Sequence, residues 1–145
     1  MEIHQGCRHL ADAELVRAFE ECQLPHGSFH HADHIRLAWI YVCRHGAEDA
    51  ETRLLAGIRK MAQHANRPQK FLYTTTVAWT RLVAAAHRQD PKIENFADWA
   101  RLHPRLLDRT LLAKHYSPGR LETEEARSGW VEPDLRPLGR SAIRD

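Results

Sequence analysis

The sequence lacks the features that mark membrane-embedded, secreted and disulfide-bonded proteins. No apolar run approaches the ~20 residues that a transmembrane helix needs. The first residues, MEIHQGCRH, contain no apolar segment of the kind found in secretory signals. The cysteines Cys7, Cys22 and Cys43 are odd in number and form no CxxC pair. We therefore expect no membrane partner, and a cytoplasmic protein with free thiols.

An excess of charge of one sign is also lacking. The chain has 21 Lys and Arg against 19 Asp and Glu, a net charge of +2 with histidines neutral. This is too small to indicate a nucleic-acid partner. Residues 58–70 form a basic junction with some likeness to a helix–turn–helix, but such junctions are common in helical bundles, and the apolar helix that follows would be an unusual reader of DNA. No glycine-rich phosphate loop, GxSxG elbow or kinase-type signature is present.

What the sequence does contain is helical periodicity throughout. At 145 residues and 43% hydrophobic composition, the chain is long enough for one domain that folds without a metal or a disulfide. We predict an all-α, single-domain bundle of five to seven helices, with an N-terminal arm over residues 1–11 and an extended C-terminal tail over 129–145 that docks on the body. The helices are expected at 12–23, 29–45, 47–65, 69–88, 90–103, 104–114 and 123–128.

Histidine is the unusual component, with 11 residues. Three of them, His30, His31 and His34, fall within five residues and begin the most apolar segment of the chain. At about 100° per residue, His31 lies in the middle of the apolar face of the expected helix, and His34 lies on its flank beside Tyr41. The residues that the same count turns away from this face are Asp33, Arg36, Ile40 and Arg44. An outward isoleucine indicates that a further element covers part of that side.

Helical spacing brings His31 and His34 to one face, with Cβ atoms ~5–6 Å apart. This arrangement supports a general acid–base pair, because imidazole can hold or release a proton near neutral pH. It is also how helices form sites for divalent transition metals, although two histidines are too few ligands and no HExxH motif is present. The third interpretation is a core histidine, His31, hydrogen-bonded to a partner such as Thr75. The sequence leaves these three interpretations open.

The helix expected over 69–88 would supply the opposite side of a pocket. Its inward face places Thr75 among apolar residues, as His31 is placed on the earlier helix. A threonine there could hydrogen-bond a ligand or orient His31, or it could simply bond the backbone of its own helix. Aromatic side chains at helical spacing could form the walls, although they are more often plain core. The ligand-binding residues that we predict on this basis are Thr75, Thr74, Trp79, Tyr41 and Leu72.

Four segments resemble a family of small, all-helical bacterial proteins that has no assigned function. They are FHHADHIRLAWIY (29–41), KFLYTTTVAW (70–79), HYSPGRL (115–121) and VEPDLRP (131–137). The resemblance implies that His31, His34, Thr74 and Thr76 belong to a shared site. In the family pattern, a further histidine followed by an acid stands where this chain has Leu72 and Tyr73, which would complete a three-histidine metal site. Leu72 removes that ligand here.

The combined prediction is a small cytoplasmic enzyme, of a kind found in specialised metabolism. It would act on a small organic molecule in a pocket between the helices around 29–45 and 69–88, with His31 or His34 as the general acid–base and no required cofactor. One alternative is a non-catalytic binding or interaction protein, with a homodimer formed through exposed apolar residues near Ile40. The other is a metalloprotein with a divalent transition metal bound by His31 and His34.

Overall fold

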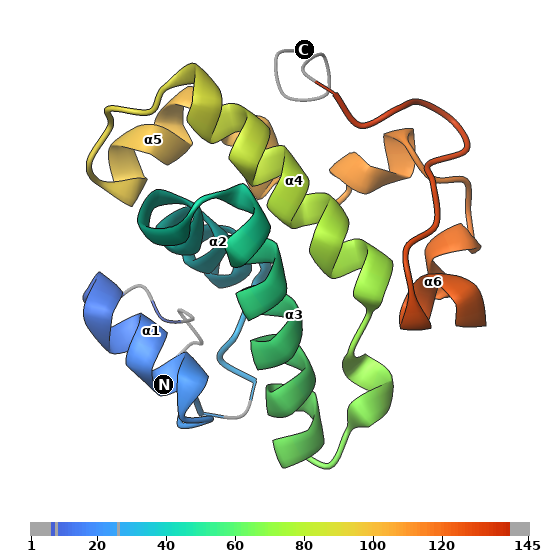
Figure 1. Ribbon diagram of the computed structural model, residues 1–145, viewed down its shortest axis with the longest axis horizontal. Coiled ribbons are helices and arrows are strands. Elements are labelled where there is room, and N and C mark those ends of the chain that lie inside the picture. Colours follow the sequence, from blue (N-terminus) through green and yellow to red (C-terminus); the bar gives the residue numbers. More distant parts are fainter. Residues whose placement is uncertain (1–6, 8, 26, 140–145) are drawn as a thin grey trace, which may run out of the picture.

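The computed structural model describes residue 7, residues 9–25 and residues 27–139, and this part of the chain is all-helical, as predicted. Figure 1 shows the arrangement of the α-helices, with α4 crossing the middle of the molecule. The helices are α1 (Asp12–Glu20), α2 (His31–His45), α3 (Ala47–His64), α4 (Tyr73–Gln89), α5 (Phe96–Leu102) and α6 (Glu124–Ser128). Short 3₁₀ turns occupy Pro68–Lys70, Pro104–Leu107, Leu111–Lys114 and Arg120–Glu122. None of the described helices is long and apolar enough to cross a bilayer.

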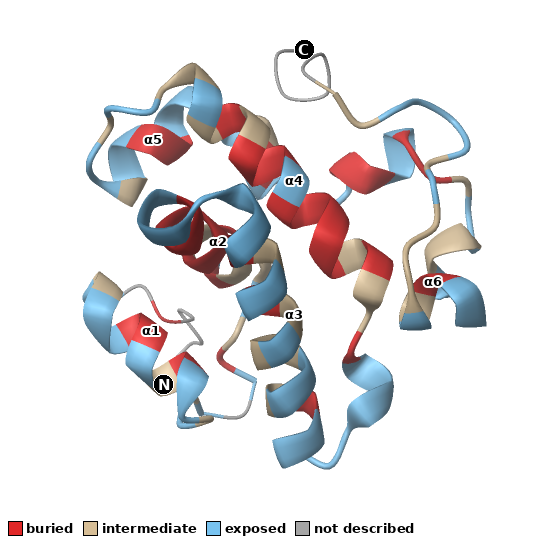
Figure 2. Cartoon of the chain, viewed as in Figure 1, coloured by how far each residue is buried: buried red, intermediate tan, exposed pale blue. Residues whose placement is uncertain are grey.

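Helices α2, α3 and α4 pack against one another and form the centre of the core. In Figure 2, buried residues cover most of the visible length of α4, because α6 packs on it as well as α2 and α3. Helix α1 closes the side formed by α2 and α3. Its Phe19 ring lies directly against the backbone of Gly57, where an added Cβ would stand 2.4 Å from a ring carbon. A side chain at position 57 would therefore clash with this helix.

The start of α2 shows why the histidine segment is helical. His30 is the N-cap, and the Asp33 carboxylate accepts the His30 backbone N–H at 2.8 Å. Ser28, two residues before the cap, donates its hydroxyl to the Pro25 carbonyl. Gly46 ends the helix at φ +86°, in the left-handed region that glycine tolerates best.

Three residues that the angle count turned away from the core are covered by other segments. Asp33 is only 3% exposed, and its second carboxylate oxygen accepts the backbone N–H of Cys7. Arg36 donates to the carbonyls of Cys7 and Leu10 and pairs with Asp12 at 2.7 Å. Ile40 is 2% exposed. The outward position predicted for Asp33 is wrong, because Cys7 of the N-terminal arm packs on it, whereas the burial of Ile40 agrees with the further element that we expected to cover its side. The arm residues 1–6 and 8 lie outside the described part of the chain.

Several expected helices are shorter in the structure. Helix α4 begins at Tyr73 rather than near Gln69, because a 3₁₀ turn and an extended Phe71–Leu72 precede it. Asn95 caps α5 by accepting the Asp98 N–H, so this helix begins at Phe96 rather than at the predicted position 90. The segment 104–114 forms two 3₁₀ turns rather than one helix. In contrast, Thr123 caps α6 as expected, with its hydroxyl accepting the Ala126 N–H.

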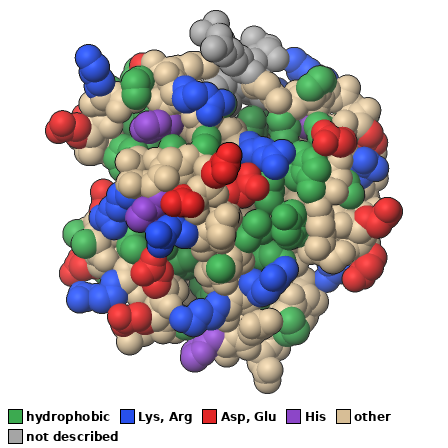
Figure 3. All heavy atoms as spheres, in the orientation of Figure 1, with side chains coloured by type: hydrophobic (Ala, Val, Ile, Leu, Met, Phe, Trp, Pro, Cys, Tyr) green, Lys and Arg blue, Asp and Glu red, His purple; other side chains and the backbone are tan. Residues whose placement is uncertain are grey.

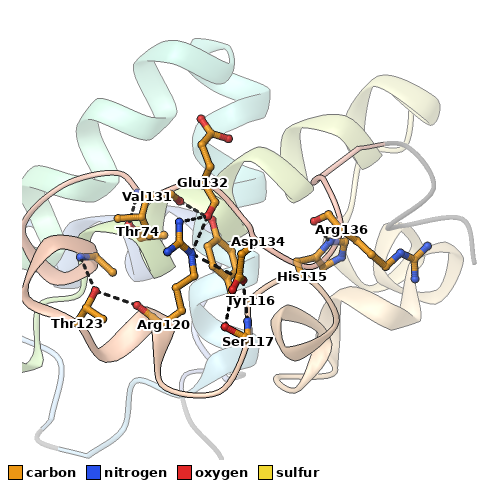
Figure 4. A network of polar contacts seen from close by, with 11 residues as sticks. Thr74, His115, Tyr116, Ser117, Arg120, Thr123, Val131, Glu132, Asp134 and Arg136 are labelled. Carbon is orange, nitrogen blue, oxygen red and sulfur yellow. Dashed lines mark hydrogen bonds and ion pairs between the residues drawn. The ribbon is translucent and has the colours of Figure 1, made fainter.

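The tail docks on the body over residues 129–139, and polar contacts with its backbone hold it (Figure 4). Thr74, Tyr116 and Arg120 donate to the carbonyls of Gly129, Val131 and Glu132. Ser117 bonds the Asp134 carboxylate through both its N–H and its hydroxyl. These hydrogen bonds hold the described part of the tail against the body, while residues 140–145 lie outside the described part of the chain.

Candidate functional site

His31, at the first position of α2, is half-buried and held by two contacts. Its Nε2 lies 2.9 Å from the Leu106 carbonyl oxygen, in the turn Pro104–Leu107. Its ring meets the Trp79 ring edge-on at 4.4 Å between centroids. Because a carbonyl oxygen only accepts, Nε2 must carry the proton, and in the neutral ring the lone pair stands on Nδ1. Within the described part of the chain no side chain or backbone group bonds Nδ1, which leaves a proton acceptor there.

The electrostatic surroundings of His31 keep it neutral near pH 7. Burial is the largest influence and lowers its pKa, and the charge of Arg109 lowers it further. The bond to the Leu106 carbonyl and the charge of Asp108 act in the opposite direction. These three residues come from the 106–109 loop, which contains none of the predicted site residues. No local signal links this loop to a helix 75 residues earlier.

His34 lies three residues further on and faces a different environment. Its Nε2 is fully enclosed and has no hydrogen-bond partner among the described residues. Its ring lies 6.1 Å from that of Phe29, which stacks in turn on Phe19. Burial, with a smaller effect from His31, lowers the pKa of His34 to about 4. At neutral pH His34 is therefore uncharged and is a weak base.

The three histidines do not share a ligand set. His30 places Nε2 3.0 Å from the Gly27 carbonyl, and His31 places its own on Leu106. Within the described ranges, no group of three or more histidine, cysteine, aspartate or glutamate side chains could hold a metal ion. The metal interpretation for His31 and His34 stays a prediction without a third donor.

Thr74 and Thr75, which we predicted to bind a ligand, have different surroundings in the structure. Thr74 is fully buried, donates its hydroxyl to the Gly129 carbonyl at 2.6 Å and accepts the Val131 N–H at 3.0 Å. Thr75 is only half-buried and makes no side-chain hydrogen bond in the described structure. The expected pairing of Thr75 with His31 is therefore wrong, because the Leu106 carbonyl takes that position. Thr74 anchors the tail.

Two further residues of the predicted pocket do not line a common space with His31. Tyr41 points toward α1, where its hydroxyl donates to Glu20 at 2.6 Å and its ring lies near Phe19. Leu72 is the extended, half-buried N-cap of α4 rather than a residue on its inward face. It precedes Trp79 by seven residues, which is about 10 Å along a helix axis. Trp79, in contrast, does pack its ring on His31.

Two hollows among the described residues lie away from His31. A groove of about 1160 Å³ runs between the start of α3, the second half of α4 and the tail. Figure 3 shows this face, where hydrophobic side chains border acidic and basic ones. Arg81 crosses the groove, with its guanidinium 4.4 Å from the Trp130 ring and 3.1 Å from the Glu51 carboxylate. A smaller pocket of about 580 Å³ lies between α2, the end of α4 and the loop that leads to α5.

The surface proposed for a homodimer is not exposed. Ile40, on which that expectation rested, is buried beneath the smaller pocket. The exposed large hydrophobic residues in the described ranges are Leu102, Leu107 and Leu135.

Comparison with known proteins adds no relative. No family model matches the chain, and neither a curated protein nor a solved structure does. The resemblance to the helical bacterial family therefore stays a prediction, and the function must be argued from the geometry alone.

Proposed function

We propose that this protein is a small enzyme that acts on a small organic molecule by histidine acid–base chemistry, with His31 as the proton acceptor. The observation that carries the proposal is the hydrogen bond from Nε2–H of His31 to the Leu106 carbonyl, which leaves a free lone pair on Nδ1. A histidine oriented through one ring nitrogen and free at the other is the arrangement that general bases use.

The groups around His31 suit a ring that takes up a proton and then returns it. Nδ1 removes a proton from the bound molecule and the ring becomes an imidazolium. The charge of Asp108 stabilises that cation, while Arg109 opposes it and attracts an anionic substrate. The edge-on contact with Trp79 restrains the ring, so that the proton acceptor keeps one direction. His34, uncharged and enclosed, supports this helix turn and takes no proton in the step.

The test compares three single variants in a screen of small organic acids, esters and amines. We expect His31→Ala to lower kcat by about 100-fold to 10,000-fold, the usual contribution of a general base. His45→Ala is the matched control, because His45 is an exposed histidine at the end of the same helix, and it should leave kcat unchanged. His34→Gln should change kcat far less than His31→Ala. Activity that survives in a folded His31→Ala variant would overturn the proposal.

A direct check of the tautomer needs no substrate. The ¹⁵N shifts of the His31 ring should show a protonated Nε2 and an unprotonated Nδ1 near pH 7. A proton on Nδ1 would contradict the assignment, because the free nitrogen could then not act as a base.

The groove between α3, α4 and the tail favours a second candidate, a non-catalytic small-molecule-binding protein. Its floor includes Thr80 and Ala84, and its rim carries the exposed Arg88. A ligand found by thermal shift whose affinity is unchanged in His31→Ala and falls in Arg88→Gln would support this candidate over the enzyme.

A further inference from the structure

The smaller pocket lies at the opposite end of α2 from His31 and is made by different residues. Its volume of about 580 Å³ falls within the range of roughly 300–1,000 Å³ that small-molecule sites occupy. It is lined by the second half of α2, the end of α4 and the loop over residues 91–94. The lining residues are Asp12, Trp39, Ile40, Cys43, Arg44, His87, Pro91, Lys92, Ile93 and Glu94.

The lining has an apolar wall. Trp39 and Ile40 are 3% and 2% exposed, and Pro91 and Ile93 of the loop complete the apolar part. The Trp39 ring packs on Phe96, which restrains this wall. The Trp39 Nε1–H is enclosed. The attraction of this wall for a ligand is therefore the burial of apolar surface.

The rim carries more unpaired positive than negative charge. Arg44 and Lys92 form no ion pair within the described ranges. Asp12 is engaged by Arg36 at 2.7 Å, which leaves Glu94 as the opposing acid. His87 is half-buried, and burial and Arg88 lower its pKa, so it offers a hydrogen bond rather than a charge near pH 7.

We propose that this pocket binds a small organic anion with a flat apolar body, of the class of aromatic carboxylates and sulfonates. The apolar body lies on Trp39, Ile40 and the 91–94 loop, and the anionic group lies at the rim beside Arg44 and Lys92. The site is separate from His31, so the proposal does not depend on the proposed enzyme activity.

Anilinonaphthalene sulfonate is a suitable probe, because it has an aromatic body and one fixed negative charge. We expect saturable binding at one site by fluorescence. Phenylnaphthylamine, which has the same rings without the sulfonate, should bind at least about tenfold more weakly, the contribution of one charge-assisted hydrogen bond. Equal binding of the two probes would contradict the requirement for an anion.

Substitutions of the charged residues at the rim test whether the probe binds in this pocket or elsewhere. Arg44→Gln with Lys92→Gln should weaken the sulfonate by about tenfold or more, and Glu94→Gln should strengthen it. The matched control is Arg53→Gln, an exposed arginine that lines neither hollow, and it should change the affinity by less than about twofold. Full binding in the double variant would assign the probe to another site and overturn the proposal.

Cys43 gives a readout that does not depend on charge. It is exposed on the wall of the pocket, while Cys22 lies outside it and Cys7 is buried. Saturating probe should slow alkylation of Cys43 by at least about fivefold, measured by peptide mass spectrometry, as expected for a site occupied most of the time. Cys22 in the same sample is the internal control. Unprotected Cys43 at saturation would also overturn the proposal.

Discussion

His31 and His34 lie on the same helix, three residues apart, yet their ring nitrogens have different hydrogen-bond partners. His31 is oriented by a backbone carbonyl and keeps a free ring nitrogen. His34 lies beside Phe29, and its buried Nε2 has no hydrogen-bond partner among the described residues. Both residues are histidines of the same helix. The difference between their surroundings therefore comes from the segments that cover each side of α2. We call these the closed side, around His34, and the open side, around His31.

The largest effect on stability is expected from removing a core side chain on the closed side. Phe19→Ala should lower the free energy of unfolding by about 3–5 kcal/mol, because the ring is 1% exposed and packs on Phe29, Tyr41 and the Gly57 backbone. Urea denaturation followed by circular dichroism measures it. Leu102→Ala, at a residue 54% exposed, is the control and should change the stability by no more than about 0.5 kcal/mol. A similar small change for Phe19→Ala would mean that the closed side is loosely packed.

The enclosure of His34 predicts a loss of stability in mild acid. Its pKa is about 4 in the folded protein against 6.5 for an ordinary histidine. Below about pH 6.5 the unfolded chain binds a proton that the folded chain does not, so stability falls as the pH falls from about 6.5 to about 4. The loss from this group is about 3 kcal/mol at about pH 4.

His34→Gln separates this effect from the titration of carboxylates. The variant has no titrating group at position 34, so its stability should fall by about 3 kcal/mol less than that of the parent between about pH 7 and pH 4. Urea titrations of both proteins across this range give the difference. Parallel pH profiles would show that His34 is hydrated and titrates normally.

Thr74 and Thr75 allow a second comparison, between two residues of the same type on α4 that lie in different surroundings. Thr74→Val should cost about 1–3 kcal/mol, because it leaves the Gly129 carbonyl and the Val131 N–H without partners. Thr75→Val should change the stability by no more than about 0.5 kcal/mol, since Thr75 makes no such bonds. Proteolysis of the tail should also accelerate only in Thr74→Val. Equal effects of the two substitutions would contradict the anchoring role.

The features that depend on neighbours in the sequence could be predicted. Helical periodicity predicted the all-α class, Gly46 the end of α2, and Thr123 the start of α6. These signals act within one or two turns of the chain, so no tertiary contact is needed to interpret them. Docking of the tail was also expected from its apolar residues.

The roles of Thr74 and Asp33 could not be predicted, because they depend on segments that arrive from elsewhere. An angle count assumes one buried face, and α4 is covered by three helices, so the count could not choose between Thr74 and Thr75. The partners of Thr74 lie 55 and 57 residues later, and Asp33 is buried by Cys7 of the arm. The partner of His31 was missed for the same reason.

Apart from the control substitutions, the smallest effect on stability is expected at His31. His31→Gln removes one hydrogen bond, to the Leu106 carbonyl, at a half-buried position. The expected cost is about 0.5–1.5 kcal/mol near pH 7, measured by urea denaturation. Leu106 itself is fully buried, so a much larger loss would mean that the 104–107 turn detaches with the histidine. That result would favour a core role for His31, whereas a small cost combined with a lost activity requires a ring that is positioned for chemistry.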